Sequence, residues 1–106
     1  MNTTGESGES SIPILTLFVT GNAPRSRRAR SNLSAMLARL GRTDLRPYEI
    51  DLLAQPEQGL SNSVFATPSL LKTSATGEVS VLYGDLSDEP RLQRFLADLA
   101  SAGSAR

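Results

Sequence analysis

The chain contains no cysteine and no histidine among its 106 residues. Without cysteine it has no disulfide bond, no thiolate nucleophile and no cysteine-ligated metal. Without histidine it lacks the commonest general base and the commonest metal ligand. From these two absences we expect no catalytic residue, no metal site and no cofactor.

Long apolar runs are also missing, and no stretch approaches the roughly 20 residues that span a bilayer. Residues 1–11 are rich in Gly, Ser, Thr and Glu, and they resemble neither a signal peptide nor a membrane anchor. We predict a disordered N-terminal segment at 1–11, one domain over 12–100 and a flexible tail at 101–106. The expected location is the cytoplasm, without membrane contact.

The formal net charge is zero, but the charges are distributed unevenly. Residues 25–46 contain seven arginines and one acid, whereas residues 47–106 contain four basic and eight acidic residues. This asymmetry predicts a basic face on one element and acidic surface elsewhere. Nucleic acid is disfavoured as a partner, because the overall charge is neutral and no aromatic residue accompanies the arginines.

Hydrophobic patterning predicts alternating strands and helices. Residues 12–20 are nearly all apolar and β-prone, as in a buried strand of a parallel sheet, and residues 25–40 repeat apolar side chains at helical spacing before Gly41. The period of two over 48–52 indicates a second strand, joined to the first by a parallel crossover. We further predict short helical turns within 54–65 and a hairpin of strands at 69–73 and 78–83. A last helix follows, capped by Ser87 or Asp88. Its apolar stripe consists of Leu92, Phe95, Leu96 and Leu99.

This order of elements predicts an α/β, thioredoxin-like fold: a mixed four-stranded sheet with helices on both faces. In thioredoxins the loop after the first strand holds two redox cysteines, and a cis-proline precedes the third strand. The corresponding loop here, residues 20–26, contains no sulfur, and Pro68 occupies the cis-proline position. Thioredoxin-type redox chemistry is therefore excluded.

Four sequence blocks resemble those of KaiB proteins in order and spacing. They are residues 17–26 (LFVTGNAPRS), 50–57 (IDLLAQPE), 64–70 (VFATPSL) and 84–87 (GDLS). The chain is identified from these blocks as a divergent member of the KaiB family. The resemblance implies a non-catalytic circadian-clock or signalling adaptor that binds a KaiC-type ATPase and modulates its output. A KaiA-like protein or a sensor histidine kinase would be a further partner.

The resemblance also indicates where a partner would bind: on the helix over 26–40 and on the strand over 69–73. Arg28 and Lys72 fall on basic family positions that contribute to KaiC contact, and we add Arg25 and Arg27 as a docking patch for an acidic surface. Cations in the first turns of a helix oppose its dipole by roughly 0.3–1 kcal/mol each, which favours a use for them. The competing interpretation of these residues and of Arg30 is a solvated helix face.

Two segments depart from the family pattern. Some KaiB proteins exchange between a tetramer-forming fold and a monomeric thioredoxin-like fold. Residues 73–78 lack the family's proline-rich turn, and Gly77 favours an ordinary hairpin there. Phe-Leu-Ala stands at 95–97 in place of Gly-Leu-Asp. We expect a chain that stays in the thioredoxin-like fold, as a monomer or a homo-oligomer.

Two other functions remain open at this point. One is a divergent thioredoxin or glutathione-transferase-like enzyme, in which Asn22 or Ser26 would position a thiol. The other is a SasA-like sensor domain in stress signalling.

Overall fold

A four-stranded mixed sheet organises the protein, and the structure, a computed structural model, describes residues 14–99. Its strands are β1 (Ile14–Val19), β2 (Tyr48–Asp51), β3 (Ser69–Thr73) and β4 (Val79–Tyr83), in the spatial order β2-β1-β3-β4. β1 and β2 are parallel, whereas β3 is antiparallel to both β1 and β4. The predicted sheet, crossover and hairpin are confirmed. The predictions for residues 1–11 and 101–106 fall outside the described residues.

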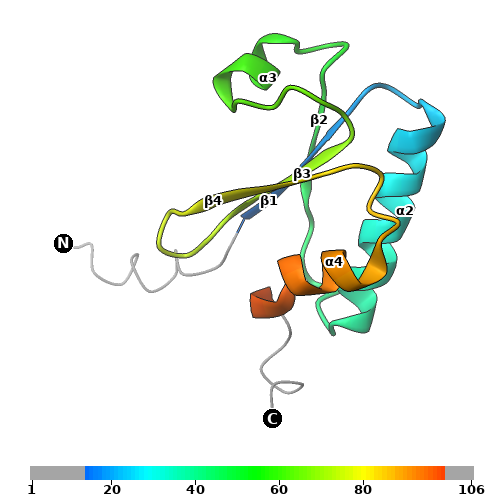
Figure 1. Ribbon diagram of the computed structural model, residues 1–106, viewed down its shortest axis with the longest axis vertical. Coiled ribbons are helices and arrows are strands. Elements are labelled where there is room, and N and C mark those ends of the chain that lie inside the picture. Colours follow the sequence, from blue (N-terminus) through cyan, green and yellow to red (C-terminus); the bar gives the residue numbers. More distant parts are fainter. Residues whose placement is uncertain (1–13, 100–106) are drawn as a thin grey trace.

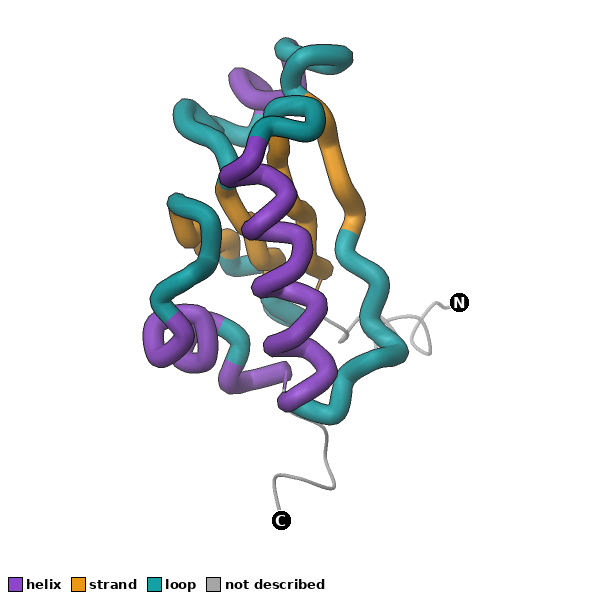
Figure 2. The backbone as a smooth tube through the Cα atoms, turned by 90° about the vertical axis from the view of Figure 1, so that its right-hand side faces the viewer, coloured by secondary structure: helices purple, strands orange, loops and turns teal. Residues whose placement is uncertain are grey.

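The helices are distributed unequally over the two faces of this sheet. α2 (Pro24–Arg39) and α4 (Glu89–Phe95) lie on the same side, as Figure 1 and the turned view of Figure 2 show. The short α3 (Glu57–Ser61) lies near the end of the sheet where β1 finishes (Figure 1). A 3₁₀ turn, η1 (Ala97–Leu99), follows α4. The final helix is thus shorter than predicted, because Leu99 N–H bonds to the carbonyl of Leu96 and tightens the last turn.

The end of α2 and the beginning of α4 both follow from local chemistry. At Gly41, with φ of 73°, the left-handed conformation ends α2, as predicted. The N–H of Arg42 then bonds to Leu37 O at 2.8 Å, satisfying a carbonyl that the helix leaves open. Asp88 is the N-cap of α4, and its side chain accepts a hydrogen bond from Arg91 N–H at 3.2 Å. Of the two predicted caps, Asp88 is the one used.

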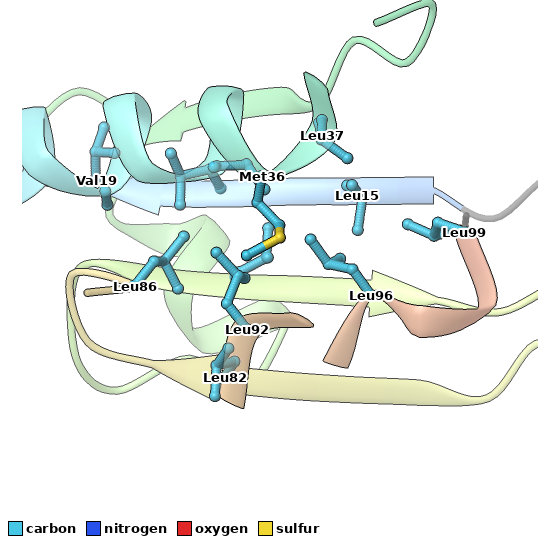
Figure 3. Packing of buried hydrophobic residues seen from close by; sticks show 13 residues of the cluster. Leu15, Val19, Met36, Leu37, Leu82, Leu86, Leu92, Leu96 and Leu99 are labelled. Carbon is cyan, nitrogen blue, oxygen red and sulfur yellow. The ribbon is translucent and has the colours of Figure 1, made fainter. Parts of the chain in front are cut away.

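The main core lies between the helices α2 and α4 and one face of the sheet (Figure 3). α2 contributes Leu33, Met36 and Leu37, while the C-terminal elements contribute Leu92, Leu96 and Leu99, the last two fully buried. Because α4 has only seven residues, too few to be stable alone, its helical state depends on these contacts.

The other face of the sheet is covered only at one end. Phe18, Val64 and Leu71 form a small buried cluster there. α3 sits against this cluster closely enough that a Cβ on Gly59 would lie 3.1 Å from Val64 O. At the opposite end of the same face Ile14 and Val79 are 48% and 59% exposed. Within residues 14–99, no helix has the length and apolar character to cross a membrane.

Candidate docking site

The candidate site is the N-terminal end of α2 together with the two loops beside it, residues 20–23 and 84–88. Ala23 is the N-cap of α2 and provides no side-chain hydrogen bond, and the first turn contains no acidic residue. The N–H of Thr20, in the loop before the helix, donates a hydrogen bond to the Ser26 hydroxyl at 3.0 Å and so links this loop to the first turn of α2. A helix start with arginines and without an acid or a capping side chain is electrostatically unfavourable on its own.

Arg30 is fully engaged in holding this end of the molecule together. Its guanidinium donates to Glu49 Oε2 at 2.9 Å, to Gly21 O at 3.0 Å and to Asn22 Oδ1 at 3.2 Å. The hydrogen bond to Glu49 raises the pKa of Arg30 above its usual value. Arg30 therefore ties α2 to β2 and to the preceding loop, and its charge is paired with Glu49 within the molecule.

Arg28 joins α2 to the loop that leads into α4. Its Nε lies 3.0 Å from Asp85 Oδ2, and its side chain is 54% exposed. Asp85 also accepts from Ser87 N–H at 3.1 Å, and its carbonyl accepts from the Asn32 amide at 2.9 Å. Hydrogen bonds from the Ser87 side chain and from Arg28 lower the pKa of Asp85 to about 2. Asp85 thus closes the turn before α4 and does not cap the helix itself.

The lowered pKa of Asp85 predicts a change of stability in acid. Since the folded-state pKa of about 2 lies below the unfolded value of 3.8, the stabilisation is present above pH 3.8 and is lost as the pH falls through about 2. Asp85→Asn should therefore flatten the profile of unfolding free energy against pH in this window. Urea unfolding at a series of pH values measures it, and Arg28→Met should raise the Asp85 titration midpoint seen by carbon NMR. An unchanged acid slope in Asp85→Asn would contradict the assignment.

Of the four arginines at the start of α2, Arg25 and Arg27 are the two whose charge is not paired with an acidic side chain of the described residues. Both are exposed, and neither forms an ion pair with any residue of the described chain from 14 to 99. Arg27 donates to the carbonyl of Asn22 at 2.6 Å, which leaves its charge uncompensated. Arg25 lines a shallow cavity of about 110 Å³ together with Gly84, Ser87 and Arg91. We call Arg25, Arg27 and the exposed side of Arg28 the arginine surface.

Lys72 does not join this surface. It pairs with Leu15 near the beginning of β1, whereas α2 starts beyond the end of that strand. Its side chain is only 13% exposed, and its ammonium lies 2.6 Å from Phe95 O, 2.8 Å from Asp98 Oδ1 and 5.0 Å from the Phe95 ring centroid. The sequence grouped Lys72 with Arg25, Arg27 and Arg28, but the structure does not bring them together.

The loop where thioredoxins carry their cysteines is a satisfied structural turn in this chain. The Thr20 and Thr67 hydroxyls are hydrogen-bonded to each other, and the Thr67–Pro68 peptide bond is cis. Asp51 accepts from the N–H groups of Gly21 and Leu53 at 3.0 and 2.9 Å, and these bonds lower its pKa. Residues 14–99 contain no cluster of three acidic, histidine or cysteine side chains able to hold a metal.

The two residues that a thiol-handling enzyme would need are both occupied. The Ser26 side chain accepts from Thr20 N–H and is 1% exposed, and the Asn22 side-chain oxygen accepts from Arg30. The chain contains no histidine, the commonest base that activates such a residue.

Comparison with known proteins identifies the family. No family model matches the chain. The circadian clock oscillator protein KaiB of Prochlorococcus marinus strain MIT 9211 is 35% identical over 104 residues, covering 86% of this chain and 90% of that protein. The KaiB of Synechococcus sp. RCC307 is 40% identical over 81 residues, covering 74% of this chain and 71% of that protein. The chain belongs to the KaiB family.

Solved structures establish the fold of this KaiB-family chain independently. Fasciola hepatica thioredoxin superposes with a TM-score of 0.67 at 17% identity, covering 89% of this chain and 88% of the thioredoxin. The Edwardsiella tarda protein Trxlp gives a TM-score of 0.68 at 17% identity, with coverages of 90% and 94%. At such low identity these likenesses show the fold alone, and the predicted thioredoxin-like class is confirmed.

Proposed function

We propose that this KaiB-family chain is a non-catalytic circadian-clock or signalling adaptor that binds a KaiC-type ATPase and modulates its output. Family membership at 35–40% identity supports the clock context, since the relatives compared are named circadian clock oscillator proteins. The arginine surface is the observation that supports docking. A KaiA-like protein or a sensor histidine kinase would be a further partner of the bound adaptor.

The electrostatics of α2 support an acidic docking partner. Arg25 and Arg27 sit in its first turn, where each exposed cation is unfavourable by roughly 0.3–1 kcal/mol. Their charge is not compensated by an ion pair within the described residues. A carboxylate-rich surface laid over this end would interact favourably with the two guanidinium groups and with the helix dipole together. Complementary charge of this kind acts mainly on association rate and specificity.

The mechanism of modulation would be a difference in affinity between two states of the ATPase. An adaptor that binds one nucleotide state more tightly shifts the population of the partner toward that state. A pull-down of a KaiC-type ATPase, first with ATP and then with ADP, tests this. Equal retention in both nucleotides would leave modulation without a physical basis.

Charge reversal on the arginine surface tests the docking face. The double variant Arg25→Glu/Arg27→Glu should weaken binding to the ATPase at least tenfold, and the wild-type affinity should fall as salt is raised. The fold should survive, because both side chains are exposed and make no ion pair in the described chain. Isothermal titration or surface plasmon resonance at two salt concentrations gives the measurement.

The matched control is Arg46→Glu. Arg46 is also exposed, but it precedes β2 and so lies toward the opposite end of the parallel β1–β2 pair from the start of α2. Its reversal should leave the affinity within a factor of about two, as expected for a charge outside the interface. If the control weakened binding as much as the double variant, only net charge would matter and the proposed docking face would be wrong.

A further inference from the structure

A cavity of about 290 Å³ lies between α2 and the edge of the sheet at β2. The loop at residues 40–47, which returns from the end of α2 to the beginning of β2, forms part of its wall (Figure 2). We call it the α2–β2 cavity. The arginine surface contributes no residue to its lining, so it is a feature separate from the candidate docking site.

The base of the α2–β2 cavity is apolar. It is lined by Leu17 of β1 and by Leu33 and Leu37 of α2, which are buried core residues with exposures of 2%, 3% and 4%. The loop adds two further apolar residues, Leu45 and Pro47, to the lining. Core side chains that border a cavity lack packing partners on that side, so an apolar ligand gains contacts with them.

The charged groups around the cavity are paired with one another. The Arg30 guanidinium lies 2.8 Å from Glu49 Oε2, and both residues line the cavity. Arg42 lies 3.0 Å from Asp44 Oδ1 and also donates to Leu99 O at 3.1 Å. A charged ligand would have to break one of these pairs or lose its water without gaining a counterion. A neutral ligand leaves both pairs intact, so the cavity selects against charge.

We propose that the α2–β2 cavity binds a small, neutral, two-ring aromatic molecule with one hydrogen-bonding substituent. An apolar cavity of about 150 Å³ accepts benzene, and the volume here is roughly twice that. A rigid ring system also loses less conformational entropy on binding than a flexible chain of the same volume. Ser34 and Thr43, which also line the cavity, bring hydroxyl groups that can bond to the substituent. This inference does not rest on the proposed adaptor function.

Titration of the full chain with 2-naphthol, followed by amide NMR, tests the site. This probe is neutral, has two fused rings and carries one hydroxyl. It should bind with a dissociation constant of about 0.1–1 mM, as expected for so small a molecule. The largest shifts should fall on residues 33–38 and 42–49, which contain most of the lining. The charged analogue 2-naphthoate should bind at least tenfold more weakly, because its carboxylate finds no unpaired cation there.

Filling the cavity from α2 should block the probe. Ala38 is exposed and lines the cavity, so Ala38→Phe should weaken 2-naphthol binding at least tenfold. Ala35→Phe is the matched control, since Ala35 is also exposed on α2 but is not part of the lining. Its affinity for 2-naphthol should stay within a factor of about two of the wild type. If circular dichroism shows Ala38→Phe to be unfolded, Ser34→Phe takes its place.

Glu49→Gln tests the selection against charge, because it removes the carboxylate that is paired with Arg30. It should strengthen the binding of 2-naphthoate about threefold or more and leave that of 2-naphthol nearly unchanged. The proposal is overturned if 2-naphthol shifts none of the lining amides at its solubility limit. It is also overturned if the wild type binds 2-naphthoate as tightly as 2-naphthol, or if Ala35→Phe weakens binding as much as Ala38→Phe.

Discussion

Leu96→Ala is expected to lower the free energy of unfolding by about 3 kcal/mol, roughly a 15 °C drop in melting temperature. Leu96 is fully buried in the main core, where it follows α4 and precedes η1 (Figure 3). Truncation leaves a cavity and removes a principal attachment of a seven-residue helix that is not stable alone. The total free energy of unfolding of a typical domain is about 5–15 kcal/mol, so this loss is a large fraction of it.

Urea denaturation followed by circular dichroism measures the loss, and amide exchange locates it. Exchange should accelerate most over residues 89–99, since α4 and η1 lose their anchor. Leu53→Ala makes the same chemical change at a side chain that is 70% exposed, and it should cost less than about 0.5 kcal/mol. A loss below 1 kcal/mol in Leu96→Ala, with α4 amides still protected, would show that α4 is held by something else.

Lys72→Glu is expected to destabilise the fold by about 2–4 kcal/mol. The side chain of Lys72 is 13% exposed, and its ammonium contacts Phe95 O and Asp98 Oδ1, both in the C-terminal helical segment. A carboxylate at this position would face a carbonyl oxygen and a second carboxylate, with little water to screen them. The result should be partial release of η1 and the end of α4.

The control at this position is Lys72→Met, which keeps the apolar stem beside the Phe95 ring and removes only the charge. It should cost about 1 kcal/mol, since Asp98 is 53% exposed and can be hydrated. Urea unfolding and exchange at residues 95–99 give the comparison. The sequence instead predicted partner contact at Lys72. Weakened binding to a KaiC-type ATPase with unchanged stability would favour that role over the positioning role described here.

The order of the elements and several of their boundaries were predictable because local chemistry sets them. β3 occupies the predicted residues 69–73, since an apolar run there is bounded by Pro68 and by a polar turn. Gly41 ends α2 as predicted because it adopts a positive φ. The length of α4 was not predictable, because an apolar stripe at Leu92, Leu96 and Leu99 is buried equally well by a helix that tightens into a 3₁₀ turn.

The candidate site was predicted only in part. The arginines at the start of α2 are visible in the sequence, but their separate roles depend on distant residues. Arg30 is hydrogen-bonded to Glu49, 19 positions away in the sequence, and Arg28 is hydrogen-bonded to Asp85, 57 positions away. The role of Lys72 also depends on distant residues. Strand periodicity predicts which face of the sheet it lies on, but the structure is needed to show that residues 95–98 cover that face. The sparsely covered second face escaped prediction because the central strand β1 is apolar at every position except Thr16.

The strand order has a consequence for how the chain folds. Residues 14–51 form one compact β-α-β unit and residues 69–99 a hairpin followed by a helix, so each half closes through short loops. The β1–β3 pairing, the core shared by α2 and α4, and polar contacts such as Arg28–Asp85 join the halves, across the whole connection from 52 to 68. The entropy of closing that long loop is lost before its hydrogen bonds form. We therefore expect the pairing of β1 with β3 to set the folding rate of the domain.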